Sequence, residues 1–414
     1  MKNEIVNHID QPKVLEKMYQ DNKVNFKKEF NVVYPEIENN PIAMVWHERL
    51  NYENNEISWG SPKELSFVII ASLLAGFIAK IPEPLGLKPE YFYPRNIGFI
   101  IFPILSAYFA WKNQLPTNKI RSLALASLAA VIYINILPNN TESDTLLLSC
   151  IHLPLFLWSI LGFTFISKNI YAVKNRLDFL RYNGDLVVIT ILILLAGGLL
   201  TGITIGLFTL IGFDISNFYF EYIVVFGLAA SPIVGTYVVQ TNPQLVNKVS
   251  PVIAKIFTPL VLITLVIYLL AIMVSGKDPY KDREFLMLFN ALLLGVMAII
   301  LFSIAETARS AKSKLTFNML FLLSVLTIIV NSIALSAILF RISEWGISPN
   351  RLAVLGGNIL ILINLILVSI NLFKATKNAE KIELVENSIA TFLPFYSAWT
   401  IIVTFIFPFA FGFK

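Results

Sequence analysis

Four uncharged polar side chains interrupt long apolar stretches of this sequence, namely His152, Asn290, Asn331 and Asn358. Each stretch has about the 20 residues that a helix needs to cross a bilayer. Carboxylates and lysines, which drive proton and ion relays at membrane depth, occur only at the ends of these stretches. The chemistry that the four residues predict is therefore hydrogen bonding, to one another, to water or to a neutral or polar solute.

Two interpretations of these residues stay open. A polar group that faced lipid would have no hydrogen-bond partner, so all four must face other helices or water. Interhelical hydrogen bonds, worth about 0.6 kcal/mol on average, are the simpler interpretation. The alternative is a shared substrate-binding cavity near the outer end of the helices. Asn364 and Asn371 lie deeper and seven residues apart, on one face of the helix that carries Asn358.

A candidate rim for that cavity comes from two charged loops, which contribute Asp278, Arg283, Arg341 and Arg351. Arg283 lies seven residues before Asn290, so both share one helical face. The simpler interpretation is a pair of solvated loops with a tryptophan at the membrane interface. A charged rim would instead favour anions or zwitterions at the mouth of the cavity.

The sequence lacks the motifs of nucleotide-driven pumps and common hydrolases. It has no Walker A loop, no G-x-G-x-x-G after a strand, no H-E-x-x-H and no G-x-S-x-G. One cysteine, Cys150, lies in an apolar stretch, and His8, His47 and His152 are far apart. These observations predict no metal site and no cofactor, assign no catalytic residue, and make an enzyme the less favoured class.

Two neighbouring apolar stretches carry small residues at every fourth position. They are Gly198, Gly202 and Gly206 in the first, and Gly227, Ser231 and Gly235 in the second. Small residues at this spacing let helix backbones approach closely in a membrane. The pattern predicts that the two helices pack face to face, and a hinge is the alternative.

The elements that must position these residues are membrane-spanning helices. Of the 414 residues, 56% are hydrophobic and 14% are charged, whereas a soluble domain needs roughly a quarter charged. We expect an all-α, polytopic transmembrane bundle of about eleven helices. The expected spans are 65–81, 96–111, 120–137, 145–166, 186–213, 219–239, 256–274, 285–304, 315–340, 352–373 and 389–412.

Lysine and arginine in the connecting loops predict the orientation of these helices. With a cytoplasmic N-terminus, the inner loops hold fifteen of them and the outer segments eight. Positive residues favour the cytoplasmic side, so the C-terminus is expected outside. The inner connector 167–184 is either an amphipathic helix at the interface or an ordinary basic loop.

Residues 1–60 form a separate polar unit ahead of the transmembrane domain 61–414. We expect three short helices in it, and Asn40 before Pro41 is typical of a helix start. The unit offers little apolar surface for a core of its own. We therefore expect it to lie in the cytoplasm and to pack on the membrane domain or on a protein partner.

Nearly the whole chain resembles an uncharacterised bacterial multi-pass membrane family, classed as domain of unknown function 4153. The matching stretches are Arg181–Ile203, Ser250–Ala271, Gly276–Asn290, Arg341–Leu355 and Phe392–Pro408, together with Trp46–Leu50 (WHERL). The resemblance implies a protein of the bacterial inner membrane. It implies no catalytic residue.

Three classes of function remain after these observations. A permease-like transporter of a neutral or polar solute is favoured first, and a non-enzymatic envelope sensor or scaffold acting through residues 1–60 follows closely. An enzyme acting on a lipid-linked substrate is third. The expected partners are the lipid bilayer and a cytoplasmic protein, without nucleic acid, and the sequence leaves the oligomeric state open.

Overall fold

The structure is a computed structural model that divides into two compact units, Met1–Ser58 and Trp59–Lys414. In the residues that it describes, the regular structure is helical throughout, without a strand. The described residues are 2–21, 23–51, 60–140, 142–167, 172–210, 213–243, 256–267, 269–270, 280, 283–307, 314–378 and 381–414.

The described residues of the N-terminal unit form four helices where three were expected, because a short first helix adds to the others. They are α1 (Lys2–Asn7), α2 (Pro12–Asp21), α3 (Lys23–Ile37) and α4 (Pro41–Asn51). Asn40 caps α4 as predicted, since its Oδ1 accepts from the Ile42 amide at 2.8 Å. The unit also has a core of its own, in which Phe26 and Phe30 pack against Trp46.

Among its described residues, the second unit contains eight helical segments that are long and apolar enough to cross a membrane. They are α5 (Pro62–Ala79), α7 (Thr117–Ile136), α8 (Asp144–Ile166), α9 (Val173–Leu210), Ser216–Thr241, α14 (Lys314–Trp345), α15 (Pro349–Lys377) and Ile382–Ala410. Ser216–Thr241 comprises α10 (Ser216–Phe218), η1 (Tyr219–Val224) and α11 (Val225–Thr241), and Ile382–Ala410 comprises α16 (Ile382–Ile401), η3 (Ile402–Ile406) and α17 (Phe407–Ala410).

Three of the eleven expected spans fall outside this group of eight. They correspond to α6 (Pro89–Lys112), to the apolar helix Ile256–Ile267, and to α13 (Arg283–Thr307), whose apolar part is Leu292–Ile304. The helical, polytopic class is confirmed, and a total of eleven spans stays a prediction.

Large apolar side chains cover the outside of these helices. In α5, for example, Ile70 and Phe77 are each about two-thirds exposed, and Leu199 of α9 is similarly exposed. Soluble proteins rarely expose contiguous apolar surface of this kind. Together with the eight apolar helices, this surface identifies an integral, multi-pass membrane protein whose outside contacts lipid.

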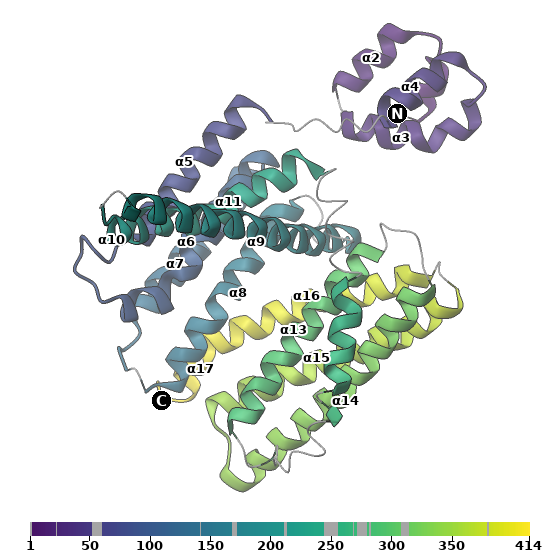
Figure 1. The fold of residues 1–414 in the computed structure, drawn as a ribbon. Coiled ribbons are helices and arrows are strands. Elements are labelled where there is room, and N and C mark those ends of the chain that lie inside the picture. Colours follow the sequence, from purple (N-terminus) through teal and green to yellow (C-terminus); the bar gives the residue numbers. More distant parts are fainter. Residues whose placement is uncertain are drawn as a thin grey trace. The chain divides into compact units, whose positions relative to one another are not determined.

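The membrane helices gather into two groups, each around its own core (Figure 1). The first bundle comprises α5, α6, α8, α9 and α11, and its core includes Leu105, Leu161 and Ile233. The second bundle comprises Ile256–Ile267 and α13 to α16, and its core includes Ile300 and Leu365. Helix α16 also contacts α8 and α9, so it lies at the seam between the two bundles.

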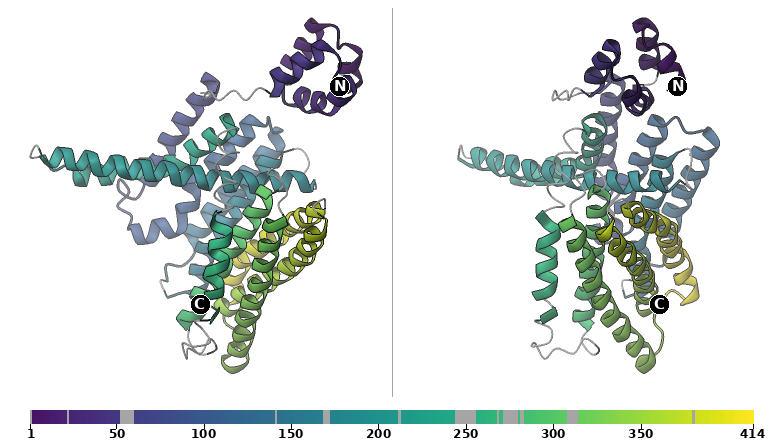
Figure 2. Two further views of the ribbon diagram at one scale, coloured as in Figure 1. Left: turned by 45° about the vertical axis from the view of Figure 1, so that its right-hand side comes forward. Right: turned by 90° about the vertical axis from the view of Figure 1, so that its right-hand side faces the viewer.

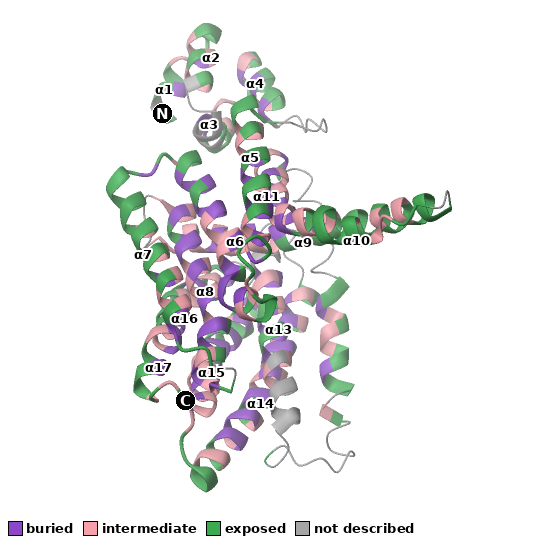
Figure 3. Ribbon diagram, turned by 90° about the vertical axis from the view of Figure 1, so that its left-hand side faces the viewer, coloured by how far each residue is buried: buried purple, intermediate pink, exposed green. Residues whose placement is uncertain are grey.

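Helix α9 runs for 38 residues, about 57 Å at about 1.5 Å per residue. Residues 173–184 of the expected basic connector form its first turns, so they are neither a separate interfacial helix nor a loop. Its first half packs in the first bundle through Phe179 and Tyr182, whereas its second half extends beyond the neighbouring helices (Figure 2) and is mostly exposed (Figure 3).

Candidate functional site

Three of the four predicted cavity residues meet at one place in the second bundle. Asn358 of α15 donates from Nδ2 to Asn290 Oδ1 of α13 at 2.8 Å. Asn331 of α14 donates from Nδ2 to the backbone carbonyl of Asn358 at 3.0 Å. Asn331 and Asn358 are both buried. This asparagine cluster therefore joins three helices at one level.

His152 does not belong to the asparagine cluster. It lies on α8, and its Nδ1 is 2.9 Å from the backbone carbonyl of Leu148, one turn earlier on the same helix. An imidazole can satisfy one of its nitrogen atoms within its own helix in this way. Similar depth alone therefore does not bring His152 to a shared site.

The deeper pair extends the polar interior along α15. Asn364 donates from Nδ2 to the Tyr396 hydroxyl at 3.0 Å, and Asn371 donates to Ser388 Oγ at 2.8 Å. Both partners lie on α16, which confirms that Asn364 and Asn371 share one face. From Asn358 to Asn371, polar side chains follow α15 for about 20 Å at about 1.5 Å per residue. We call these hydrogen-bonded residues, with the asparagine cluster, the polar ladder.

Two acceptors in the polar ladder have no hydrogen-bond partner among the residues that the structure describes. They are Oδ1 of Asn331 and Oδ1 of Asn364, and both residues are fully buried. A buried acceptor without a partner costs about 1–3 kcal/mol, so such groups are usually satisfied by water or a ligand. The ladder thus combines formed hydrogen bonds with two free acceptors, and its side chains are amides and hydroxyls rather than acids and bases.

The predicted rim residues lie partly outside the described residues, which do not include Asp278 or the side chain of Arg283. Arg341 and Arg351 both lie over Trp345, with guanidinium carbon to ring centroid distances of 5.3 and 5.7 Å. Arg351 also donates to the carbonyls of Trp345 and Gly346 at 2.9 and 2.7 Å. These contacts stabilise the turn between α14 and α15.

The structure does not bring the two small-residue stripes together. A Cβ atom added at Gly198, Gly202, Gly206 or Gly227 would meet no atom of the described residues within 4 Å. Ser231 is buried and bonds to its own helix, donating to the Leu228 carbonyl at 2.9 Å. Of the six, Gly235 approaches α9 closely, where an added Cβ would lie 2.8 Å from Thr190 Oγ1.

Close approach occurs at glycines that the spacing did not indicate. A Cβ added at Gly356 of α15 would lie 2.1 Å from the Trp399 ring, and one at Gly76 of α5 would lie 2.1 Å from the Phe226 ring. Gly184 of α9 meets Phe302 in the same manner at 2.2 Å. Aromatic rings, rather than other glycines, fill the space that these residues leave.

Two charged residues at the ends of predicted spans, Arg95 and Asp185, are buried by packing. Arg95 of α6 is 3% exposed, and its guanidinium donates to the Ile134 carbonyl at 2.5 Å and lies 4.6 Å from the Tyr91 ring. Its positive charge meets the carbonyl end of α7, where the helix dipole favours a cation. Arg95 therefore fastens α6 to α7, and no sequence pattern indicated this role.

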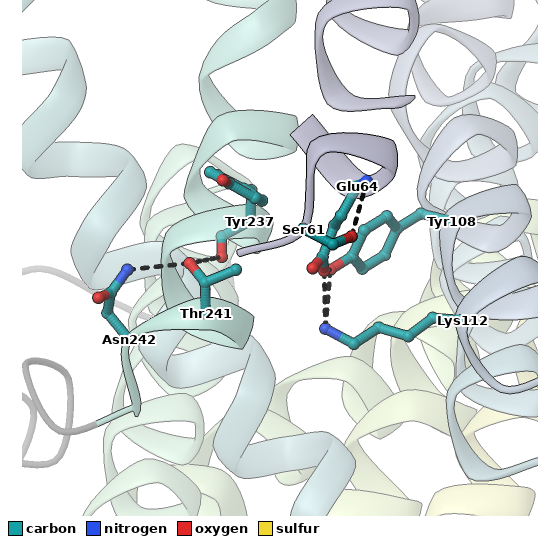
Figure 4. Close-up of polar contacts among 7 residues, drawn as sticks. All are labelled: Ser61, Glu64, Tyr108, Lys112, Tyr237, Thr241 and Asn242. Carbon is teal, nitrogen blue, oxygen red and sulfur yellow. Dashed lines mark hydrogen bonds and ion pairs between the residues drawn. The ribbon is translucent and has the colours of Figure 1, made fainter. Parts of the chain in front are cut away.

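A second charged contact joins α5 to α6 (Figure 4). The Glu64 carboxylate accepts from the Tyr108 hydroxyl at 2.5 Å and from Lys112 Nζ at 2.9 Å. Ser61 caps the same helix, since its Oγ accepts from the Glu64 amide at 3.1 Å. Figure 4 also shows Thr241 at the C-terminal end of α11. Its hydroxyl donates to the Tyr237 carbonyl at 2.7 Å.

A third charged group connects α9 with α16. Arg181 donates to Glu386 at 2.6 Å and to Asp178 at 3.0 Å. Asp185, one turn further along α9, is 4% exposed. Asp185 lies just before the predicted span 186–213, at a stretch end as the sequence indicated, and it is nevertheless buried.

Across the described part of the chain, no three His, Cys, Asp or Glu side chains gather in a way that could hold a metal ion. Comparison of the chain with models of protein families, with curated proteins and with solved structures found no match in any of the three. The site must therefore be interpreted from its own geometry.

Proposed function

We propose that the protein is a permease-like carrier of a neutral or polar solute, and that the polar ladder of α13 to α16 lines its path. The observation that carries this proposal is the pair of buried acceptors on Asn331 and Asn364. Amide and hydroxyl groups suit an uncharged solute, because they exchange hydrogen bonds without a fixed charge. The ladder extends for about two-thirds of the roughly 30 Å hydrocarbon layer.

The topology and location belong to the same proposal. A cytoplasmic N-terminus and an outer C-terminus follow the charge bias of the loops, and the family resemblance favours a bacterial inner membrane. In this orientation the asparagine cluster lies toward the outer face and Asn371 toward the inner face. A solute would then pass the cluster first when it enters from outside.

Water access to the ladder tests the proposal without knowledge of the solute. In a Cys150→Ala background, cysteines at Asn331 and Asn364 should react with a small water-soluble methanethiosulfonate reagent in proteoliposomes. A cysteine at Leu365, which is fully buried in the apolar core of the same bundle, is the matched control. Lack of reaction at both ladder positions would show a dry hydrogen-bonded seam and count against transport.

A second candidate function, a sensor or scaffold, is favoured by a groove in the N-terminal unit. The groove has a volume of about 600 Å³ and lies between α2 and α4, where Pro12, Val45 and Trp46 contribute to its lining. Val45 is 67% exposed, so an apolar side chain stands at the edge of the groove. Charged residues, namely Lys13, Glu16 and Arg49, complete the lining. A groove that combines apolar and charged side chains suits a helical or extended segment of a partner protein.

Crosslinking in intact cells would separate the two functions. Deletion of residues 1–55 and the single change Val45→Glu should remove the same crosslinked product if the groove binds a partner. Val32→Glu, at another exposed valine of the unit, should leave that product in place. Identical products from all the variants would count against the scaffold.

A further inference from the structure

An apolar groove lies at the seam of the two bundles, away from the polar ladder. Helices α8 and α16 form its walls, the beginning of α9 closes one end, and its volume is about 360 Å³. Its lining is mostly aromatic and aliphatic, including Phe156 and Phe163 from α8 and Ile401 from α16. On α8 the lining residues extend over ten positions, or about 15 Å.

The groove opens toward the lipid-facing surface of the protein. Phe163 and Ile401 are 47% and 41% exposed, so both contribute to the lining and to the outer surface. Both helices are apolar enough to cross a membrane. The molecules that surround this opening are therefore lipids, and acyl chains suit its apolar walls.

One end of the groove is cationic. Arg176 of α9 lines this end and is held in place by a hydrogen bond from Nη1 to the Ala390 carbonyl of α16 at 3.2 Å. The nearby carboxylates of Asp178 and Glu386 accept hydrogen bonds from Arg181. A planar guanidinium beside an apolar channel matches a phosphate group that is attached to a hydrocarbon chain.

The remaining polar side chains hold the walls together. The Ser159 hydroxyl of α8 donates to Ser397 Oγ of α16 at 2.9 Å, and both residues line the groove. Trp158 lines it as well, and its Nε1 donates to Asn183 Oδ1 at 2.8 Å. Arg176 is the charged side chain of the lining, so it is the group that can discriminate between headgroups by charge.

We propose that this groove is a binding site for one anionic membrane phospholipid, with its phosphate at Arg176 and an acyl chain between α8 and α16. The proposal is independent of the transported solute, because the groove and the polar ladder share no residue. It gives the seam between the bundles a lipid as a structural partner. Binding should then favour anionic over zwitterionic headgroups.

Fluorescence quenching of Trp158 tests the site in the full-length protein. The protein is reconstituted with brominated phosphatidylglycerol or brominated phosphatidylcholine, and the Trp158 signal is the difference between wild type and Trp158→Phe. Quenching should begin at a lower fraction of phosphatidylglycerol. Arg176→Gln should reduce that preference by about tenfold, the value of one charge-assisted hydrogen bond. Lys174→Gln, at an exposed cation of the same helix, should leave it unchanged.

A groove-filling change supplies the second arm of the test. Ala398→Phe adds a ring at the groove without touching Arg176, so quenching of Trp158 by both lipids should fall. Equal quenching by the two lipids in wild type would overturn the headgroup assignment. Unchanged quenching in Ala398→Phe, with the variant folded by circular dichroism, would overturn the site.

Discussion

Replacing Asn331 by leucine distinguishes a wet polar path from a dry seam by the sign of the stability change. The substitution removes the hydrogen bond to the Asn358 carbonyl, worth about 0.6 kcal/mol in a membrane bundle. It also removes the buried Oδ1 acceptor that has no protein partner. If water or solute satisfies that acceptor, a further bond worth about 0.5–1.5 kcal/mol is lost.

The carrier proposal thus predicts that Asn331→Leu destabilises the protein by about 1–2 kcal/mol. A dry acceptor predicts the opposite. Removing it would relieve about 1–3 kcal/mol of desolvation, so the variant would gain about 0.5–2.5 kcal/mol after the lost hydrogen bond is subtracted. The two cases differ in sign, and the difference does not depend on the fine magnitude of either contribution.

Reversible unfolding in mixed micelles measures this change as a free energy. Thr327→Val is the matched control, because Thr327 lies one turn earlier on the same buried face and bonds to its own helix through the Leu323 carbonyl at 2.6 Å. That variant should change the unfolding free energy little. A more stable Asn331→Leu protein would refute the presence of water at the ladder and remove the main support for transport.

Three further predictions concern glycine packing, membrane topology and an exposed carboxylate in the second unit. Gly356→Ala should destabilise the protein by about 1–3 kcal/mol, because the added methyl group overpacks against the Trp399 ring. Gly202→Ala, in open space, should be neutral or stabilising by up to about 1 kcal/mol, and thermal unfolding measures both changes. In a background whose own cysteine is alanine, a cysteine at Asn140 should react with an impermeant maleimide in intact cells, and one at Lys174 should react only after lysis; the reverse result would invert the topology. Hydrogen bonds from Lys80 and Tyr222 hold the pKa of Glu83 below its usual value. The ionised Glu83 carboxylate therefore contributes fully to stability above pH 4.5, and this contribution declines as the pH falls below that value. Glu83→Gln should flatten this acid decline in melting temperature, and an unchanged profile would show that the contact contributes nothing.

The membrane helices were predictable because lipid imposes strict length and composition. The expected span 145–166 corresponds to α8 (Asp144–Ile166), and 315–340 lies within α14 (Lys314–Trp345). The same physics brought Asn331 and Asn358 together, since a carboxamide in lipid must find a partner inside the bundle. Depth in the membrane can be read from sequence, so residues of equal depth are reasonable candidates for one site.

Direction around the helix axis is harder to predict than depth. His152 has a depth similar to that of the asparagines but bonds to the carbonyl of Leu148 in its own helix. Gly202 has the spacing of a packing motif but faces open space, whereas Gly356 contacts a ring on a helix more than forty residues away in sequence. Spacing shows which residues share a face, and the partner of that face depends on the tertiary arrangement.

The distribution of charge explains why the ladder, and not the charged groups, is the better candidate for a path. Glu64 lies in the first turn of α5, and Arg95 meets the carbonyl end of α7, so both charges lie at helix ends. Asn358 and Asn364 lie well inside α15, where a charge would cost far more than an amide. A neutral solute that exchanges hydrogen bonds with these amides would cross the interior without a buried ion. An anionic phosphate would meet its partner at Arg176, near the start of α9, and leave only its acyl chain at membrane depth. The two proposed ligands therefore divide by charge in the same way as the side chains that would hold them.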